Sequence, residues 1–180
     1  RAGKSGATRI TLFDPSGFPT QIACEVKNFN PEDFIDKKKA RRMDRFTQFG
    51  VAAAKQAIKD AMLDLSKEDL SRIGVIVGSG IGGIGTMERE HRVLIEKGPK
   101  RVSPFVIPME IIDMLPGEIA MEYEFTGPNY GVVSACASAN NAIGDALRIL
   151  RYGDADVIIT GGAEAGVTPL SIAGFSNAGA

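Results

Sequence analysis

The hydrophobic positions of this chain follow two different periods, one typical of strands and one typical of helices. Short apolar runs at 21–27, 73–77 and 157–160, and at the start of 130–139, are typical of strands. Between them, apolar residues recur every three to four positions, as on helices with one buried face. Strands that alternate with helices predict an α/β fold.

Several helices are predicted between these strands. Asp36 is placed to cap a long helix, and a second helix is expected over about 85–96, ending before Gly98 and Pro99. Residues 103–123 are apolar and divided by prolines into short helices, while 1–20 have the composition of a loop. The apolar stripe of the long helix is expected at Phe46, Phe49, Ala53, Ala57, Ile58, Ala61 and Met62.

The segment 130–139 predicts a strand that runs directly into a helix, with Cys136 at the junction. Gly153 is placed to end this helix, and the strand at 157–160 completes a βαβ unit. The helix is expected to bury a stripe made of Ala139, Ala142, Ile143, Ala146, Leu147 and Leu150.

Cys136 is therefore a candidate nucleophile. Helix N-termini present unpaired N–H groups that stabilise negative charge and favour the reactive thiolate. Functional groups of open α/β sheets also gather at the carboxyl ends of strands. The alternative is that Cys136 is only a small buried hydrophobic residue, as many free cysteines are.

The segment 78–83 matches G-x-G-x-x-G after a strand and before a helix, a pattern of dinucleotide sites. A second strand with an acidic end should follow about 20 residues later. Residues 96–104 do not fit a strand, so we favour a loop in which glycines let the backbone approach another group closely.

Charge and composition narrow the function. The 180 residues carry a net charge of −1, which gives no general case for nucleic-acid binding. The basic run 36–45 is either a solvated helix face or a patch that attracts an acidic partner. His91 is the only histidine, and its charged neighbours indicate a solvent-facing position and no zinc site. Glu164 is either a buried, paired carboxylate or a site residue.

The remaining features concern location. Cys24 lies in the strand predicted over 21–27, where we interpret it as structural and unpaired with Cys136. No apolar run reaches the roughly 18 residues of a membrane span. The chain has neither an initiator methionine nor an apolar leader at its start, so we expect it to begin inside a longer protein.

Taken together and in order, the motifs resemble the N-terminal half of the β-ketoacyl-[acyl-carrier-protein] synthases, in particular the type II condensing enzymes. The resemblance runs over nearly the whole chain, residues 1–180, as one domain incomplete at both ends. The motifs that carry it are 78–83, 101–105, 127–130, 134–138, 151–157 and 161–164.

This resemblance implies a thiolase-like fold with layers of helices and sheet, in which each half has a mixed, mostly parallel sheet of five strands. It implies a cytoplasmic homodimer that takes acyl groups from acyl carrier protein, with no metal and no cofactor beyond the phosphopantetheine of the carrier. Cys136 would hold the acyl group, and its own N–H would stabilise the tetrahedral intermediate. A malonyl-carrier protein would then lose CO₂ and attack the thioester to give a 3-oxoacyl product.

The resemblance also implies roles for other side chains. Ile81 and Phe175 correspond to the acyl pocket, and Val106 and Ile107 to a segment that reaches the partner subunit's pocket. Lys38, Arg41 and Arg42 correspond to the basic patch that binds the carrier protein.

Two departures limit the prediction. The family's first strand and helix have no counterpart before Arg1, and the second half, with two catalytic histidines, a lysine and the second oxyanion donor, has none in these residues. We therefore expect the 180 residues alone to be inactive. Alternative functions are a non-catalytic subunit like a chain-length factor, which Cys136 argues against, or a carrier-protein-binding module.

Overall fold

A computed structural model describes residues 2–179. Within them, three parallel strands form the main sheet in the order β4-β3-β5, with β3 at Ile73–Gly78, β4 at Asn129–Val132 and β5 at Val157–Gly162. A separate antiparallel pair joins β1, Ala7–Arg9, to β2, Ile22–Cys24. The strands predicted at 73–77 and 157–160 are confirmed to within two residues. The strand predicted over 21–27 is shorter, and β1 lies in the predicted loop.

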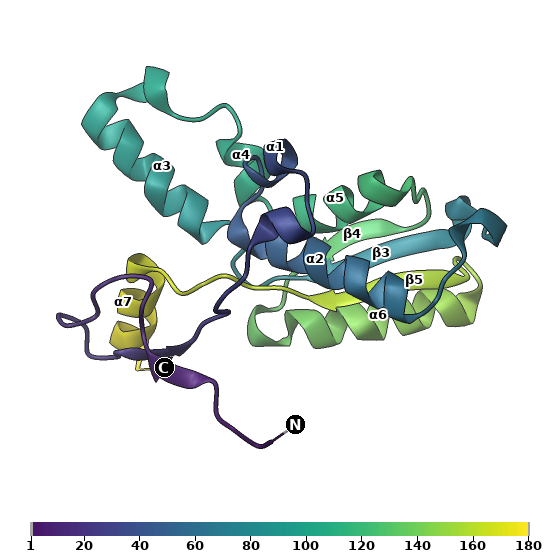
Figure 1. Ribbon diagram of the computed structural model, residues 1–180, viewed down its shortest axis with the longest axis horizontal. Coiled ribbons are helices and arrows are strands. Elements are labelled where there is room, and N and C mark those ends of the chain that lie inside the picture. The colour runs from purple at the N-terminus through teal and green to yellow at the C-terminus, as the bar shows by residue number, and fades with distance from the viewer. Residues whose placement is uncertain (1, 180) are drawn as a thin grey trace.

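Helices cover both faces of the sheet (Figure 1). Helix α6, Ser138–Tyr152, packs on one face, while α2, Arg45–Asp60, and α5, Met114–Tyr123, pack on the other. The remaining helices are α1 Lys37–Ala40, α3 Ile84–Lys97, α4 Val106–Glu110 and α7 Pro169–Ala178. Short 3₁₀ turns lie at Pro31–Asp33, Leu65–Lys67, Leu70–Arg72, Pro99–Arg101 and Ala135–Ala137. This layered α/β arrangement agrees with the predicted α/β class. The expected mixed sheet of five strands is corrected: in the described residues the main sheet has three strands, all parallel, and the antiparallel pair β1-β2 is separate from it.

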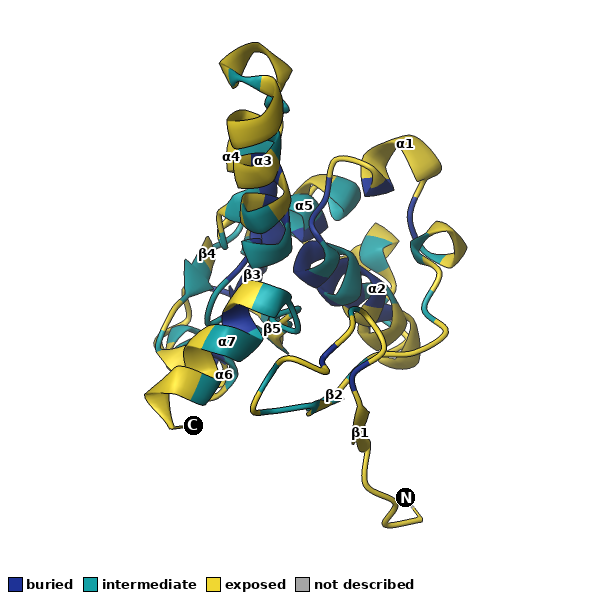
Figure 2. Ribbon diagram, turned by 90° about the vertical axis from the view of Figure 1, so that its left-hand side faces the viewer, coloured by how far each residue is buried: buried dark blue, intermediate teal, exposed yellow. Residues whose placement is uncertain are grey.

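The core lies between β3 and the helices α2 and α5. Every residue of β3 is buried, because the strand is central and covered on both faces (Figure 2). Phe46 of α2 and Leu115 of α5 are fully buried in the same cluster as Val75. Their burial anchors both helices to the strand that leads into the glycine-rich loop.

The single long helix predicted from Asp36 is wrong. Asp36 caps only α1, and Asp44 caps α2 by accepting a hydrogen bond from the Phe46 N–H. The predicted apolar stripe is also corrected. Of its residues, Phe46 and Ile58 are buried in α2, whereas Ala53, Ala57, Ala61 and Met62 are exposed. Small alanines occur on both faces of α2, so they did not reveal which face is buried. The buried positions are Phe46, Thr47, Gly50, Val51, Ala52, Ala54 and Ile58.

The predicted βαβ unit is present, but its two strands are not neighbours. β4 and β5 are parallel and joined by α6, and β3 lies between them, paired with both. Helix α6 ends at Gly153, which has the predicted left-handed conformation with φ 79°. Ala142 and Ala146 of the predicted stripe are buried, whereas the side chains of Ile143, Leu147 and Leu150 are exposed. One side of α6 therefore covers the sheet while its larger apolar residues remain at the surface.

Candidate active site

The carboxyl ends of the three parallel strands meet at one edge of the sheet. Gly78 at the end of β3 is paired with Val132 of β4 and with Gly162 of β5. Cys136 follows β4 by four residues and lies in the 3₁₀ turn Ala135–Ala137, directly before α6. The prediction that the thiol lies at a strand-to-helix junction is confirmed.

The turn that carries Cys136 is held by Ser138, whose side chain is buried. The Ser138 hydroxyl donates to the Ala135 carbonyl at 2.7 Å and accepts from the Ser134 N–H at 2.9 Å. The Asn141 side chain donates to the Ser134 hydroxyl at 2.6 Å, which ties the turn to the next turn of α6. These bonds fix the backbone on both sides of the thiol.

Ala135 adopts a left-handed conformation, with φ 50°. A residue with a Cβ is strained there by about 1–2 kcal/mol. The Ser138 hydrogen bonds to its carbonyl and to its neighbour Ser134 maintain this conformation. The strained residue therefore directly precedes the candidate nucleophile.

Two glycines bring the first turn of α6 against the strand ends. A Cβ on Gly78 would lie 2.8 Å from the Ala139 nitrogen and would overlap the Ser138 carbonyl. A Cβ on Gly162 would lie 2.6 Å from the Ala139 Cβ. Because these atoms belong to the backbone or to a short side chain, neither position has room for a larger residue.

Cys136 opens into a cavity of about 270 Å³. The thiol is exposed and free, so the alternative of a small buried hydrophobic residue is wrong. Cys24 is also free and exposed, which excludes a disulfide between the two. The cavity is lined by Gly78, Ser79, Gly80, Ala135, Cys136, Ser138, Ala139, Gly162, Ala163 and Glu164.

Glu164 follows β5 and binds the glycine-rich loop. Its Oε2 accepts hydrogen bonds from the N–H groups of Gly80 at 2.7 Å and Ile81 at 3.0 Å, and its Oε1 accepts one from the Ser79 hydroxyl at 3.2 Å. A phosphate at a dinucleotide site would need these same N–H groups. The loop thus has the predicted close approach, here to a carboxylate of the chain itself.

The side chains predicted for the acyl pocket come from three separate elements. Ile81 lies in the glycine-rich loop, Val106 and Ile107 begin α4, and Phe175 lies on α7. Ile107 is 58% exposed and Phe175 is 50% exposed. Within the described residues, none of the four lines the Cys136 cavity, so their assignment to an acyl pocket stays a prediction.

The three predicted carrier-protein residues are exposed on and after α1. The Arg42 guanidinium lies 4.6 Å from the centre of the ring of Phe105, the residue that precedes Val106 in the chain. Among the described residues, Lys38 and Arg41 make no ion pair. Two of the three charges are therefore available to a partner, and the third also packs on an aromatic ring.

Their neighbour Lys39 is used internally. It forms an ion pair with Glu122 of α5, which also pairs with Lys55 of α2. Hydrogen bonds from Lys39, and then from Lys55, lower the pKa of Glu122. This group of charges fastens α1 to the body of the domain.

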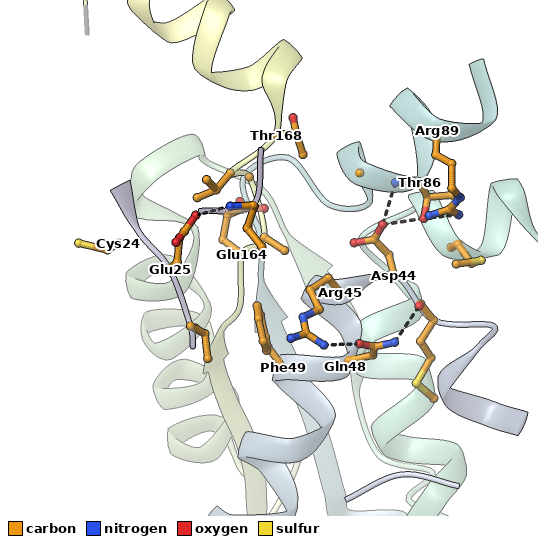
Figure 3. Close-up of a pocket in the computed structure, with 18 residues that line it drawn as sticks. Cys24, Glu25, Asp44, Arg45, Gln48, Phe49, Thr86, Arg89, Glu164 and Thr168 are labelled. Atoms are coloured by element: carbon orange, nitrogen blue, oxygen red, sulfur yellow. Dashed lines mark hydrogen bonds between the residues drawn. The ribbon is translucent and has the colours of Figure 1, made fainter. Parts of the chain in front are cut away.

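A larger cavity, of about 500 Å³, is also lined by Glu164 (Figure 3). One wall contains Asp44, whose carboxylate accepts from the Thr86 N–H at 2.9 Å and from its hydroxyl at 2.6 Å. Asp44 thereby joins the first turn of α2 to the first turn of α3. Glu164 lines both this cavity and that of Cys136, a position that its place in the sequence alone did not reveal.

The structure does not bring His91 to Cys136. His91 lies on the exposed side of α3, as predicted, and lines a different surface hollow with Ile95 and Leu170. Residues 2–179 contain no group of three or more histidine, cysteine or acidic side chains placed to hold a metal ion. None of the described helices has both the length and the apolar character needed to cross a bilayer.

A family comparison decides the classification. The model of the β-ketoacyl synthase N-terminal domain matches residues 1–180. This chain belongs to the β-ketoacyl synthase family. The predicted resemblance is thereby confirmed, and the cysteine junction described above belongs to a β-ketoacyl synthase N-terminal domain.

Curated relatives give the same result. The chain is 52% identical over 174 residues to "3-oxoacyl-[acyl-carrier-protein] synthase 2" of Staphylococcus aureus, covering 97% of this chain and 43% of that protein. It is 46% identical over 177 residues to the protein of the same name from Vibrio cholerae, covering 98% of this chain and 43% of that protein. The chain therefore spans less than half the length of these relatives.

Solved structures confirm the thiolase-like fold. The structure described as "The ishigamide ketosynthase/chain length factor" matches with a TM-score of 0.91 and 32% identity, covering all of this chain and 45% of that one. A type II polyketide ketosynthase in complex with its acyl-carrier protein matches with a TM-score of 0.81 and 27% identity. The latter covers 86% of this chain and 44% of the matched chain.

Proposed function

We propose that this chain is the nucleophile-bearing half of a 3-oxoacyl-[acyl-carrier-protein] synthase of fatty-acid elongation. The observation that carries the proposal is the position of Cys136, an exposed free thiol at the junction of β4 and α6 in a chain of this family. The Cys136 thiol ionises, and its thiolate attacks the carrier-bound thioester, so that a Cys136–acyl bond forms as the acyl–pantetheine bond breaks; the departing pantetheine thiolate takes up the proton that Cys136 gave up.

The second reaction is a decarboxylative condensation. Malonyl-carrier protein loses CO₂, and its carbanion equivalent attacks the Cys136 thioester to give a 3-oxoacyl carrier product and the free thiolate. The Cys136 N–H, in the 3₁₀ turn that precedes α6, is one proposed donor to the tetrahedral oxyanion. The histidines and the second donor are proposed to lie in sequence beyond these 180 residues, so the segment alone is expected to be inactive.

The proposed partners are acyl carrier protein and a second copy of the protein. The exposed charges of Lys38 and Arg41 support binding of an acidic carrier, and a structural relative was solved as a ketosynthase with its acyl-carrier protein. β4 pairs only with β3 in the described residues, and this open edge supports assembly of a homodimer. The phosphopantetheine arrives on the carrier. Two free cysteines fit the reducing cytoplasm, our proposed location.

The test is acyl transfer to the full-length synthase, followed by mass spectrometry of its cysteine peptides. We expect labelled acyl-carrier protein or a chloroacetyl-carrier probe to modify Cys136 and not Cys24. Cys136→Ala should abolish the label, and Cys24→Ala, which removes the other exposed thiol, should retain it. A folded wild-type enzyme that accepts the acyl group on Cys24, or on neither cysteine, would overturn the proposal and favour a non-catalytic subunit.

A further inference from the structure

We infer that Glu164 is a positioning residue that holds the glycine-rich loop, and with it Ile81, against the turn that carries Cys136. The inference rests on the proposed function, because the acyl group on Cys136 is what the positioned loop would meet. Glu164 would act through other groups, without touching the reacting atoms itself.

The first argument is the direction of the hydrogen bonds. Three donors from three consecutive residues, the Ser79 hydroxyl and the N–H groups of Gly80 and Ile81, converge on one carboxylate. The Ser79 hydroxyl also accepts from the Gly82 N–H at 3.2 Å, so that the bonds extend to the end of the loop. Glu164 therefore supplies acceptors that this turn of backbone would otherwise have to find in water.

The second argument is that the loop, where it is bound by Glu164, also packs against the turn that carries Cys136. A Cβ on Gly80 would lie 3.0 Å from the Glu164 Oε2 and 3.2 Å from the Ala135 carbonyl oxygen. Gly80 thus packs closely against both the Glu164 carboxylate and the residue that precedes Cys136. A displacement of the loop away from Glu164 would change its contact with the strained Ala135, and so the support of the turn that bears the thiol.

The third argument concerns Ile81, the predicted acyl-pocket residue in this loop. Its N–H is bound by Glu164, and its Cδ1 lies 3.5 Å from the position that a Cβ on Gly166 would take. Glu164 and Gly166 belong to one short segment after β5, so this segment holds both the backbone and the side chain of Ile81. The wall that the acyl chain would meet is placed by Glu164.

The arrangement requires hydrogen-bond acceptors and does not require a base. Among the described residues, Glu164 makes no ion pair, and its partners are neutral. A glutamine could accept from the two N–H groups with its carbonyl and donate to the Ser79 hydroxyl with its amide. Glu164→Gln should therefore preserve the loop, whereas Glu164→Ala should release it. A catalytic base would lose its activity in both variants.

The experiment compares Glu164→Gln and Glu164→Ala in the full-length synthase, with Glu96→Gln and Glu96→Ala on the exposed end of α3 as matched controls. The rate of Cys136 acylation is measured with acyl-carrier proteins of several chain lengths, and hydrogen exchange is measured on a peptide that spans residues 79–82. Glu164→Ala should lower the acylation rate on the order of 10- to 100-fold, change the chain-length profile and speed exchange of the loop. Glu164→Gln should stay within about threefold of wild type, since it keeps the bonds.

The outcomes separate this inference from the proposed function. The inference would be overturned, and the proposed function would stand, if Cys136 of the wild-type enzyme is acylated while Glu164→Ala leaves both the hydrogen exchange of the loop and the chain-length profile unchanged. Equal loss of activity in both variants would overturn the positioning role in favour of a base. If wild-type Cys136 is not acylated, the proposed function fails. The exchange data then still decide whether Glu164 holds the loop. Exchange in Glu164→Ala that is as slow as in wild type would overturn the positioning role as well.

Discussion

The Cys136 junction and the basic patch around α1 are built in opposite ways. At the junction, close backbone approach at Gly78 and Gly162 and the hydrogen bonds of Ser138 fix each atom near the thiol. At the patch, Lys38 and Arg41 are exposed side chains on a short helix and beside it, without an ion pair in the described residues. The junction is defined by geometry, and the patch by charge. Substitutions should therefore act abruptly at the first region and gradually at the second.

The largest effect is expected from Gly78→Ala. The added Cβ would overlap the backbone of Ser138 and Ala139, and overpacking of this kind should lower the free energy of unfolding by about 3 kcal/mol. Gly144→Ala, on the helix α6 that Gly78 approaches, is the control. A Cβ at Gly144 meets nothing within 4 Å, so its gain of helix propensity should raise stability by about 0.5–1 kcal/mol. Denaturant titration measures both, and equal effects would contradict the close approach.

Ser138→Ala tests the hydrogen bonds of the same junction. It leaves the Ser134 N–H and the Ala135 carbonyl without their partner, which should cost about 1–3 kcal/mol of unfolding free energy and slow acylation of Cys136. Ser71→Ala removes a comparable hydroxyl in an exposed turn and should change stability by less than about 0.5 kcal/mol. Normal acylation kinetics in Ser138→Ala would show that the turn does not depend on this serine.

The patch should respond to charge and to salt. Joint reversal in Lys38→Glu and Arg41→Glu should raise the KM for acyl-carrier protein about tenfold at low ionic strength, with kcat little changed. The effect should shrink as salt is added, because exposed charges more than about 10 Å apart are largely screened from each other at 0.1 M ionic strength. Lys59→Glu, an exposed charge at the far end of α2, is the control. If the KM for acyl-carrier protein changes neither on charge reversal nor with salt, the patch is an ordinary solvated surface.

The smallest effect is expected where the patch joins the body of the domain. Ion pairs with Lys39 and Lys55 lower the pKa of Glu122 in the folded state. Their stabilisation is therefore present above the unfolded pKa of about 4.3 and is lost as the pH falls through the lower folded value.

Glu122→Gln should therefore cost about 1 kcal/mol or less at pH 7, and nothing in strong acid, where both proteins carry a neutral side chain. Unfolding midpoints of wild type and variant from pH 7 to pH 3 measure this difference. A difference that persists or grows in acid would contradict the role of the ion pairs.

The position of Cys136 at its junction could be predicted from the sequence, whereas the start of helix α2 next to the basic patch could not, for physical reasons. A strand, a thiol and a helix in direct succession form a local pattern, so the position of Cys136 could be predicted. The start of α2 could not, because Asp36 and Asp44 are both good caps and only tertiary packing selects Asp44 for the longer helix. The exposed three-residue strand β1 has no apolar alternation that could reveal it.

The roles of Glu164 and Ser138 also depended on the structure. Glu164 reaches residues 79–81 across more than 80 positions of sequence, and no spacing indicates such a contact. Ser138 is different, since Ser134 and Ser138 flank the thiol four residues apart. This spacing across a strand-to-helix junction is a signal that could have suggested a serine bridge around the nucleophile.

The close approach at Gly78 and Gly162 also bears on how these enzymes can be recombined. Gly78 and Gly162 are more than 80 residues apart in the sequence, with the first turn of α6 between them, yet the three segments are in close contact and have no room for a larger side chain at either glycine. In a chimaera between relatives, a crossover between residues 78 and 138 would join one parent's strand end to the other parent's helix. Exchange of all three segments as one block would keep the fit, so viable crossovers should lie outside the interval 78–162.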